Sequence, residues 1–290
     1  MHKLRDQYKL KEILAATAFP KSTYMYWQQR FERPDQDLEI KQAIQTLREE
    51  HENYGYRRIH AELRKQGFKL NRKRTQRIYQ ELGMQVTAFG RKHRKYNSYR
   101  GVVGRIKPNL VNRRFKTSVP FQKITTDTTE LKYYELDAAG KLQGKKIYLD
   151  PYMDLYNREI VSYSISRQPN GVSVMTGLKE AIRKTDECPY RRTFHSDRGW
   201  AYQMPAYQDL LKKNKIFQSM SRKGNCYDNS PMENFFAILK QEMYYGHVYK
   251  SFSELAKAIT DYIKYYNEKR IKESLGWLSP VQYRQANAIA

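Results

Sequence analysis

Three acidic residues, Asp127, Asp197 and Glu233, stand where carboxylates from separate elements could reach one point. Asp127 lies inside the β-branched stretch TTDTTEL, although strand interiors disfavour Asp. Asp197 ends the short segment RRTFHSD, and Glu233 follows Pro231, where a loop gives way to an amphipathic helix. Hard oxygen ligands of this kind suit Mg²⁺ or Mn²⁺. Two such ions could activate a nucleophile and stabilise the leaving oxygen of a phosphodiester.

Glu233 also has a purely local interpretation, because Ser230-Pro-Met-Glu233 has the form of a helix capping box. In that interpretation Ser230 is the N-cap and Glu233 closes the first turn. Lys240 comes seven residues after Glu233, two helical turns along, so it lies on the same side and could contact the same substrate. A solvent-exposed lysine is the alternative.

The elements that would position these residues follow Pro120, where the chain becomes rich in strand-forming residues. Residue types and periodicity predict strands over 121–134, 145–156, 158–166, 191–197 and 216–221. Amphipathic helices are predicted over 170–185, 204–215, 231–246 and 251–270, and a last one starting at Ser279-Pro280. Pro151 predicts a bulge or a late strand start. The order predicts an α/β fold, a mixed sheet with helices on its faces. If its fourth strand runs beside the first, the three carboxylates meet at one edge.

The front of the chain predicts DNA binding through helices. Helical patterns cover 10–30 and 38–50. A helix-turn-helix pattern follows, made of a further helix, a turn at Gly67 and a second helix capped by Asn71. Basic residues gather at the start of that second helix, the part that contacts bases in such motifs: Arg72, Lys73, Arg74 and Arg77. A solvated basic face on an ordinary helical pair is the alternative.

The charge of the chain favours a polyanionic partner. The formal net charge is +24, and residues 1–120 carry 28 basic and 11 acidic side chains, so most of the excess lies at the front. Residues 91–116 contain ten basic residues and no acidic one, among them Arg91, Lys92, Arg94 and Lys95. Three aromatic residues lie between them: Tyr96, Tyr99 and Phe115. The stretch predicts an extended linker that contacts phosphates and bases. A flexible, solvated linker is the alternative.

Other classes of protein are disfavoured. The two cysteines, Cys188 and Cys226, form no paired framework, and the six histidines are scattered without zinc spacing. No run of about 18 apolar residues occurs, and the first residues lack the apolar core of a signal peptide. We therefore expect a cytoplasmic protein without a membrane span.

At these motifs the chain resembles transposases of the insertion sequence 3 family, which share a superfamily with retroviral integrases. The resemblance covers nearly the whole chain and rests on TTDTTEL, FHSDRGWAY, SMSRKGNCYDNSPMENFFAILKQE, YGYRRIHAELRKQG and YNEKRIKESLGWLSPVQY. Asp197 and Glu233 have 35 residues between them, the separation that this family shares with the integrases. Lys272 stands where the C-terminal signature often has His. A ribonuclease-H-like catalytic domain is implied.

The resemblance and the patterns together predict five segments. They are a helix-turn-helix-like segment at 1–36, a helix-turn-helix DNA-binding domain at 37–90, a basic linker at 91–118, a ribonuclease-H-like catalytic core at 119–246 and a C-terminal helical extension at 247–290. The resemblance alone implies a role for the carboxylates: Asp127, Asp197 and Glu233 would be catalytic and would hold two Mg²⁺ ions, for which Mn²⁺ could substitute.

The resemblance further implies the reaction and the partners. Water attack would free a 3′ hydroxyl at the end of the element, and that hydroxyl would then attack another phosphodiester. The expected partners are double-stranded DNA with terminal inverted repeats, target DNA and further copies of the chain in a dimer or higher oligomer. The front of the chain lacks the leucine-zipper repeats that members gain from an upstream reading frame, so an upstream-frame partner or fusion is also expected.

Other residues compete for roles near the site. Four acidic residues could replace a proposed ligand: Glu130, Asp150, Asp154 and Asp228. Asp154 and Asp228 also fit structural roles in turns. His195 could touch the substrate or tune a metal, or be a packed histidine. Three basic residues flank the site and could bind DNA phosphates, with plain surface charge as the alternative: Arg198, Arg222 and Lys223.

Two other functions compete with DNA strand transfer. A DNA-binding regulator could keep the fold after losing the chemistry, although the intact acidic trio argues against it. A ribonuclease-H-type nuclease that cuts RNA–DNA hybrids would not need the basic front region of about 120 residues. Joining of a free 3′ hydroxyl to DNA separates a transposase from both.

Overall fold

The computed structural model describes residues 2–31, 33–88 and 104–287. The chain divides into two compact units, one of Met1–Glu52 with Glu62–Gln85 and one of Asn53–Ala61 with Val86–Ala290. Four basic residues that the sequence predicts to contact DNA lie outside the described residues: Arg91, Lys92, Arg94 and Lys95.

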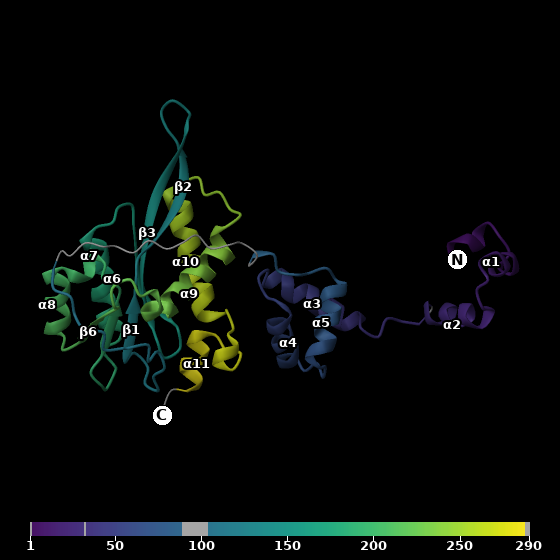
Figure 1. Cartoon of the computed structure of the whole chain (residues 1–290), viewed down its shortest axis with the longest axis horizontal. Coiled ribbons are helices and arrows are strands. Elements are labelled where there is room, and N and C mark those ends of the chain that lie inside the picture. Colours follow the sequence, from purple (N-terminus) through teal and green to yellow (C-terminus); the bar gives the residue numbers. More distant parts are fainter. Residues whose placement is uncertain (1, 32, 89–103, 288–290) are drawn as a thin grey trace. The chain divides into compact units, whose positions relative to one another are not determined.

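The first unit is helical, as predicted (Figure 1). Its helices are α1 (Leu10–Thr17), α2 (Lys21–Phe31), α3 (Leu38–Glu50), α5 (Arg72–Glu81) and the end of α4 (Tyr56–Lys65). The apolar face of α3 buries Ile40, Ile44 and Leu47, and α3 packs against α5. Asn71 caps α5 as predicted, because its side chain accepts a hydrogen bond of 2.8 Å from the Arg74 N–H.

The second unit is built on a six-stranded sheet. Its strands are β1 (Lys123–Thr126), β2 (Thr129–Leu136), β3 (Leu142–Asp154), β4 (Ile160–Ser166), β5 (Thr193–Ser196) and β6 (Phe217–Met220). The long strand β3 pairs antiparallel with β4 on one edge and with both β1 and β2 on the other. β5 pairs parallel with β1, and β6 pairs parallel with β5. The predicted mixed sheet is confirmed.

One predicted strand, 121–134, is divided into β1 and β2 at Asp127 and Thr128. The pairing with β3 keeps the same register on both sides of this break, which places Pro151 opposite Asp127. Pro151 has no N–H to donate, and the Thr128 N–H bonds to the Asp127 carboxylate over 2.8 Å. The prediction of one continuous strand is therefore wrong at these two residues. The bulge expected at Pro151 occurs just after it, in the pairing of β3 with β4.

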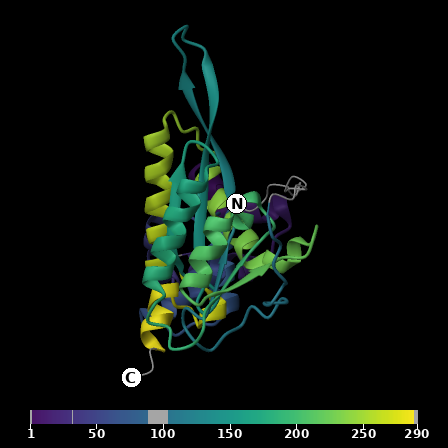
Figure 2. The same cartoon turned by 90° about the vertical axis from the view of Figure 1, so that its left-hand side faces the viewer.

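Helices cover both faces of the sheet (Figure 1). They are α6 (Gly171–Lys184), α7 (Trp200–Gln203), α8 (Pro205–Lys213), α9 (Ser230–Leu239), α10 (Phe252–Glu268) and α11 (Pro280–Ala286). On one face α6, α7 and α8 pack against Ile124 and Phe194, and on the other α9 and α10 pack against Ile147 and Leu149. The β2–β3 hairpin extends beyond the helices (Figure 2). The ribonuclease-H-like arrangement predicted from the resemblance is confirmed.

The capping box predicted at the start of α9 is absent. A 3-10 helix at Cys226–Asn229 runs directly into α9, and Ser230 already has helical backbone angles, φ −54° and ψ −30°. An N-cap residue needs a non-helical backbone, so Ser230 cannot fill that role. Asn229 occupies the N-cap position without a capping hydrogen bond. Glu233 therefore begins the helix without closing a capping box.

Candidate active site

Asp127 and Asp197 lie side by side at the carboxyl ends of two parallel strands. Each directly follows its strand, and the register that pairs Thr125 in β1 with His195 in β5, extended by two residues, places Asp127 opposite Asp197. Neighbouring strands lie about 4.8 Å apart, so both carboxylates reach the same edge of the sheet. The parallel pairing of β1 with β5 is the feature that brings together two residues 70 positions apart.

The carboxylates at this edge repel one another. Burial, and then the charge of Asp197, raise the pKa of Asp127 well above its ordinary value, and the charges of Glu233 and Asp150 add to the rise. Burial also raises the pKa values of Asp197 and Glu233. A cation at this edge would relieve the repulsion, because opposite charge favours the ionised form of a carboxyl group.

Glu233 lies in the first turn of α9, half-buried, and its carboxylate forms no hydrogen bond or ion pair within the described part of the chain. Asn229 fixes the start of this helix. Its side-chain amide donates a hydrogen bond of 3.1 Å to the Thr126 carbonyl, and its side-chain oxygen accepts one from the Thr125 hydroxyl. Asn229 was not among the residues predicted for the site. Its position directly before a Ser-Pro helix start was the only available signal.

Asp150 is a fourth carboxylate beside Asp127, and it is 2% exposed. Hydroxyl groups surround it, because Thr128 donates to it over 2.5 Å, Ser173 over 3.3 Å and Ser164 over 3.4 Å. Burial raises the pKa of Asp150 above its ordinary value. These three donors hold Asp150 in place, whereas Glu233 has none.

A glycine orients the Asp197 carboxylate. The Gly199 N–H donates a hydrogen bond of 2.7 Å to Asp197 Oδ1. A Cβ atom at position 199 would lie 2.9 Å from the same oxygen, closer than real Cβ atoms approach their neighbours. The approach of this backbone to the carboxylate therefore requires glycine.

The proposed ligands are near one another without forming a closed metal cage. No group of three or more His, Cys, Asp or Glu side chains in residues 2–31, 33–88 and 104–287 is arranged to hold a metal ion. Asp127 and Asp197 share an edge of the sheet, and Glu233 interacts with Asp127 through its charge. The structure thus brings Asp127 and Asp197 to one edge of the sheet, and the charge of Glu233 reaches Asp127 from the start of α9.

Lys240 lies in a different backbone setting from the predicted one. The α-helix ends at Leu239, and Lys240 begins a π-helical turn, Lys240–Tyr244. Burial lowers the pKa of Lys240, while the negative charges of Asp127 and Glu130 raise it. The lysine is therefore close enough to the carboxylates to interact with them electrostatically.

The basic residues predicted to bind DNA from α5 fall into two pairs. Arg72 and Lys73 are exposed. Arg74 and Arg77 instead bind Asp37, each at 2.6 Å, and Asp37 directly precedes α3. Much of the charge of the second pair is therefore neutralised within the first unit.

The basic residues predicted to flank the carboxylates also differ from one another. Arg222 binds the fully buried Asp228 through two hydrogen bonds, of 2.8 and 2.9 Å, and Arg113 binds the same carboxylate over 3.0 Å. Arg198 donates to the Ser221 carbonyl over 2.8 Å. Lys223 is exposed. Asp228 is thus the centre of an ion-pair cluster, and Lys223 is the one of the three predicted phosphate contacts that forms no ion pair or hydrogen bond within the described residues.

Asp154 and His195 are buried, and each forms hydrogen bonds that fit a structural role. Asp154 is fully buried and accepts two backbone N–H groups, at 2.9 and 3.0 Å, and burial raises its pKa to about 7. His195 is fully buried between the hydroxyls of Ser219 and Ser221, at 2.8 and 3.2 Å, and burial lowers its pKa to about 4. The packed interpretation of His195 is the one the structure favours.

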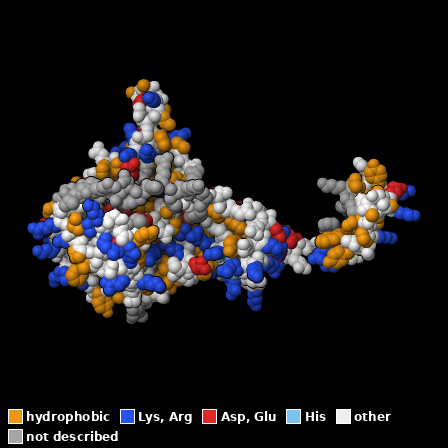
Figure 3. Space-filling view, in the orientation of Figure 1, with side chains coloured by type: hydrophobic (Ala, Val, Ile, Leu, Met, Phe, Trp, Pro, Cys, Tyr) orange, Lys and Arg blue, Asp and Glu red, His pale blue; other side chains and the backbone are white. Residues whose placement is uncertain are grey.

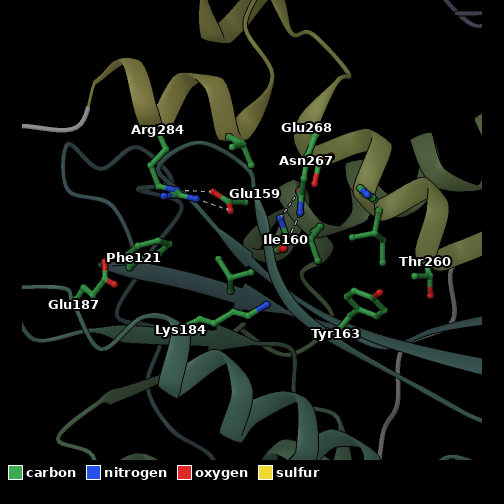
Figure 4. A pocket seen from close by; sticks show the side chains of 14 residues that line it. Phe121, Glu159, Ile160, Tyr163, Lys184, Glu187, Thr260, Asn267, Glu268 and Arg284 are labelled. Atoms are coloured by element: carbon green, nitrogen blue, oxygen red, sulfur yellow. Dashed lines mark hydrogen bonds and ion pairs between the residues drawn. The ribbon is translucent and has the colours of Figure 1, made fainter. Parts of the chain in front are cut away.

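A cavity of about 550 Å³ lies in the second unit (Figure 4). The lining includes Lys184 and the ion pair of Arg284 with Glu159, which is 2.8 Å long. It does not include Asp127, Asp197 or Glu233.

The visible face of the second unit carries many Lys and Arg side chains (Figure 3). Within the described residues, no helix has both the length and the apolar character needed to cross a membrane.

Comparison with known domain families identifies two kinds of domain. A family described as an integrase core domain matches residues 118–226, and a second one of the same description matches residues 233–287. A family described as an HTH-like domain matches residues 35–94. These matches cover the proposed carboxylates and the helix-turn-helix pattern.

Individual relatives extend over nearly the whole chain. A transposase for insertion sequence element IS150 of Escherichia coli strain K12 is 40% identical over 98% of this chain and 96% of its own length. A transposase for insertion sequence IS3A of the same strain is 29% identical over 99% of this chain and 98% of its own length.

Among solved structures, the catalytic core domain of HTLV-2 integrase in complex with magnesium covers 57% of this chain and 97% of its own length. It is 15% identical, with a TM-score of 0.42.

Proposed function

Because this chain belongs to the insertion sequence 3 family of transposases, we propose that Asp127, Asp197 and Glu233 catalyse cutting and joining of DNA at the ends of an insertion sequence. Cutting breaks a phosphodiester by water attack and leaves a 3′ hydroxyl. Joining lets that hydroxyl attack a second phosphodiester, which releases another 3′ hydroxyl. The number of phosphodiester bonds is unchanged in the joining step, so no external energy source is needed.

The observation that carries this proposal is the placement of Asp127 and Asp197 on adjacent parallel strands, with the unpaired carboxylate of Glu233 nearby. Hard oxygen donors and uncompensated negative charge fit Mg²⁺ better than a softer metal. When bound, two such ions would polarise the phosphodiester and stabilise the leaving oxygen. Asp127 and Asp197 would hold them from the sheet, and Glu233 would complete the ligands by moving towards the other two.

The basic side chains would hold the DNA. Arg72 and Lys73 at the start of α5 are the accessible pair, and we propose that they contact the terminal inverted repeat from the helix-turn-helix. Lys240 and Lys223 would contact phosphates near the reacting bond, because the charge of Asp127 reaches Lys240 and because Lys223 is exposed in the loop before α9. Dimers or higher oligomers on two element ends belong to the same proposal.

Joining of a pre-cut end tests the proposed function directly. A duplex that carries the terminal repeat and ends in a free 3′ hydroxyl is incubated with target plasmid and Mg²⁺, beside the same duplex ending in a 3′-deoxynucleotide. The proposal predicts joined product with the hydroxyl end alone. Degradation of an RNA–DNA hybrid without joining would instead favour a ribonuclease-H-type nuclease. Sequence-specific binding with neither reaction would favour a regulator.

A further inference from the structure

A second cavity, of about 610 Å³, lies in the second unit and is rich in cationic side chains. Its lining comes from the beginning of α4, the chain before β1, the end of β3 and the turn that follows it, α9, and the end of α10 with the chain after it. Its cationic lining residues are Arg58, Arg158, Arg270 and Lys272. Asp127, Asp197 and Glu233 do not line it. Whatever it binds is therefore held apart from the proposed carboxylates.

Nearby carboxylates neutralise only part of this charge. Arg270 binds Glu242 through two hydrogen bonds of 2.6 and 2.8 Å, and both side chains are almost fully buried. Arg58 lies 3.9 Å from the same Glu242 carboxylate. Glu273 lines the cavity, is 59% exposed and lies 4.0 Å from Arg57. The Glu242 carboxylate thus already interacts with two arginines, and the Glu273 carboxylate faces solvent.

Arg158 and Lys272 have no carboxylate partner among the residues that the structure describes. Arg158 Nη1 is buried without any hydrogen-bond acceptor. Lys272 Nζ donates to the Tyr266 hydroxyl over 2.6 Å and lies 4.1 Å from the centre of that ring. Burial, and then the positive charges of Arg270, Arg158 and Arg58, hold the pKa of Lys272 well below its ordinary value. Arg158 and Lys272 thus form no ion pair within the described residues, and only the more distant charges of Asp154 and Glu242 offset theirs.

We propose that this cavity binds a phosphate group, with Arg158 and Lys272 as its direct donors. A phosphate presents several acceptor oxygens, which suit both a guanidinium fork and an ammonium group. The buried Arg158 nitrogen would gain the acceptor that it lacks, and the repulsion around Lys272 would fall. The phosphate could belong to the DNA backbone or be a free ion, since the chemistry of both is the same. Asn234 of α9 lines this cavity and is the sequence neighbour of Glu233, so a DNA strand held here would lie beside the helix that carries the third proposed ligand.

Thermal unfolding in inorganic phosphate tests the site without any need for catalysis. Wild type, Arg158→Gln, Lys272→Gln and the control Lys269→Gln are compared in sodium phosphate and in sodium chloride of equal ionic strength. Lys269 is exposed and does not line the cavity. Phosphate stabilises any folded protein by exclusion from its surface, so the difference between variants is the result that counts. We expect a larger rise of the melting temperature in wild type and Lys269→Gln than in the two cavity variants.

Two features keep this experiment decisive. Lys272→Arg retains the positive charge and should keep the response to phosphate, whereas Lys272→Gln should lose it. Melting temperatures in chloride show whether each variant is folded. Equal phosphate responses in wild type, Arg158→Gln and Lys272→Gln would overturn the proposal.

The salt dependence of DNA binding then identifies the source of the phosphate. If the DNA backbone occupies the cavity, each cavity variant should reduce the slope of log affinity against log salt by about 1, and Lys269→Gln should not. A lost phosphate response with an unchanged slope would support a free phosphate ion. Repeating both measurements in an Asp127→Asn background separates this proposal from the catalytic one, because neither measurement requires strand cleavage.

Discussion

The side-chain amide of Asn229 donates a hydrogen bond of 3.1 Å to the backbone carbonyl of Thr126. This bond joins the residue before α9 to the residue before Asp127. Because Glu233 lies in the first turn of α9, Asn229 sets how the third proposed ligand approaches the first. The relationship makes Asn229 a positioning residue for the proposed site.

Replacement of Asn229 by alanine should therefore impair metal use as well as stability. Loss of this buried hydrogen-bonding group should lower the free energy of unfolding by about 1–3 kcal/mol. The Mg²⁺ concentration for half-maximal DNA cleavage should also rise, which a purely structural role would not cause. Gln285→Ala, an exposed residue of α11 that lines neither cavity, is the control and should change neither quantity. An unchanged Mg²⁺ requirement in Asn229→Ala would show that Asn229 has no positioning role.

The buried ion pair of Arg270 with Glu242 should be costly to break from one side. Both side chains are at most 3% exposed, and Tyr262 donates a further hydrogen bond of 2.8 Å to Glu242. Arg270→Met leaves a buried carboxylate without its partner and should cost about 3–5 kcal/mol in urea unfolding. The double variant Arg270→Met/Glu242→Leu should recover much of that loss, because it removes both charges.

The exposed ion pair of Lys257 with Asp261 supplies the comparison. Lys257 Nζ and Asp261 Oδ2 are also 2.6 Å apart, but the two side chains are 78% and 61% exposed. Lys257→Met should therefore change the free energy of unfolding by at most about 1 kcal/mol. Similar losses in Lys257→Met and Arg270→Met would contradict the importance of burial for the Arg270 pair.

His195 should make the protein less stable in acid. Burial lowers its pKa from 6.5 to about 4, so the unfolded chain binds a proton at a higher pH than the folded chain does. The contribution of His195 to the free energy of unfolding is constant above pH 6.5. It is lost as the pH falls from about 6.5 to about 4, by at most about 1.4 kcal/mol per pH unit. Urea unfolding across this range should show the slope in wild type and a smaller one in His195→Asn. The exposed His247, changed to Gln, should leave the slope unaltered.

The two pairs of basic residues on α5 should differ in DNA binding. Lys73→Gln removes an exposed charge and should weaken binding to the terminal repeat, with a salt slope smaller by about 1. Arg74→Gln removes a partner of Asp37 and should lower the melting temperature of the first unit more than it lowers DNA affinity. Lys69→Gln, exposed and outside α5, is the control for charge alone. Equal effects on affinity in Lys73→Gln and Arg74→Gln would show that the Asp37 ion pair does not distinguish them.

The sequence predicts the elements of this fold better than it predicts their junctions. Apolar periodicity identifies α3, α6 and α10, and β-branched runs identify the strands, because those signals are local. The break at Asp127 depends on Pro151, which the sheet places opposite it from a distant position in the chain. A reading of TTDTTEL by itself contains no sign of that proline.

The same limit applies to the candidate site. The three carboxylates could be selected from residue type and from the resemblance, but their supporting contacts join distant segments. Asn229 binds Thr126 across 103 positions, and Arg74 binds Asp37 across 37. The predicted capping box of Glu233 failed for a related reason, because the 3-10 helix before α9 was not visible in the loop composition.

The proposed role of the carboxylates can be measured as cleavage of a terminal-repeat duplex in Mg²⁺. Four proteins are compared: wild type, Asp127→Asn, Glu233→Gln and the exposed-carboxylate control Glu268→Gln. We expect nicking and joining by wild type and Glu268→Gln, and a loss of more than about a hundredfold in the other two. We also expect that the melting temperatures of Asp127→Asn and Glu233→Gln in metal-free buffer are not lowered, because each change removes a carboxylate that its neighbours repel. Cleavage by Glu233→Gln at the wild-type rate would contradict the proposed site.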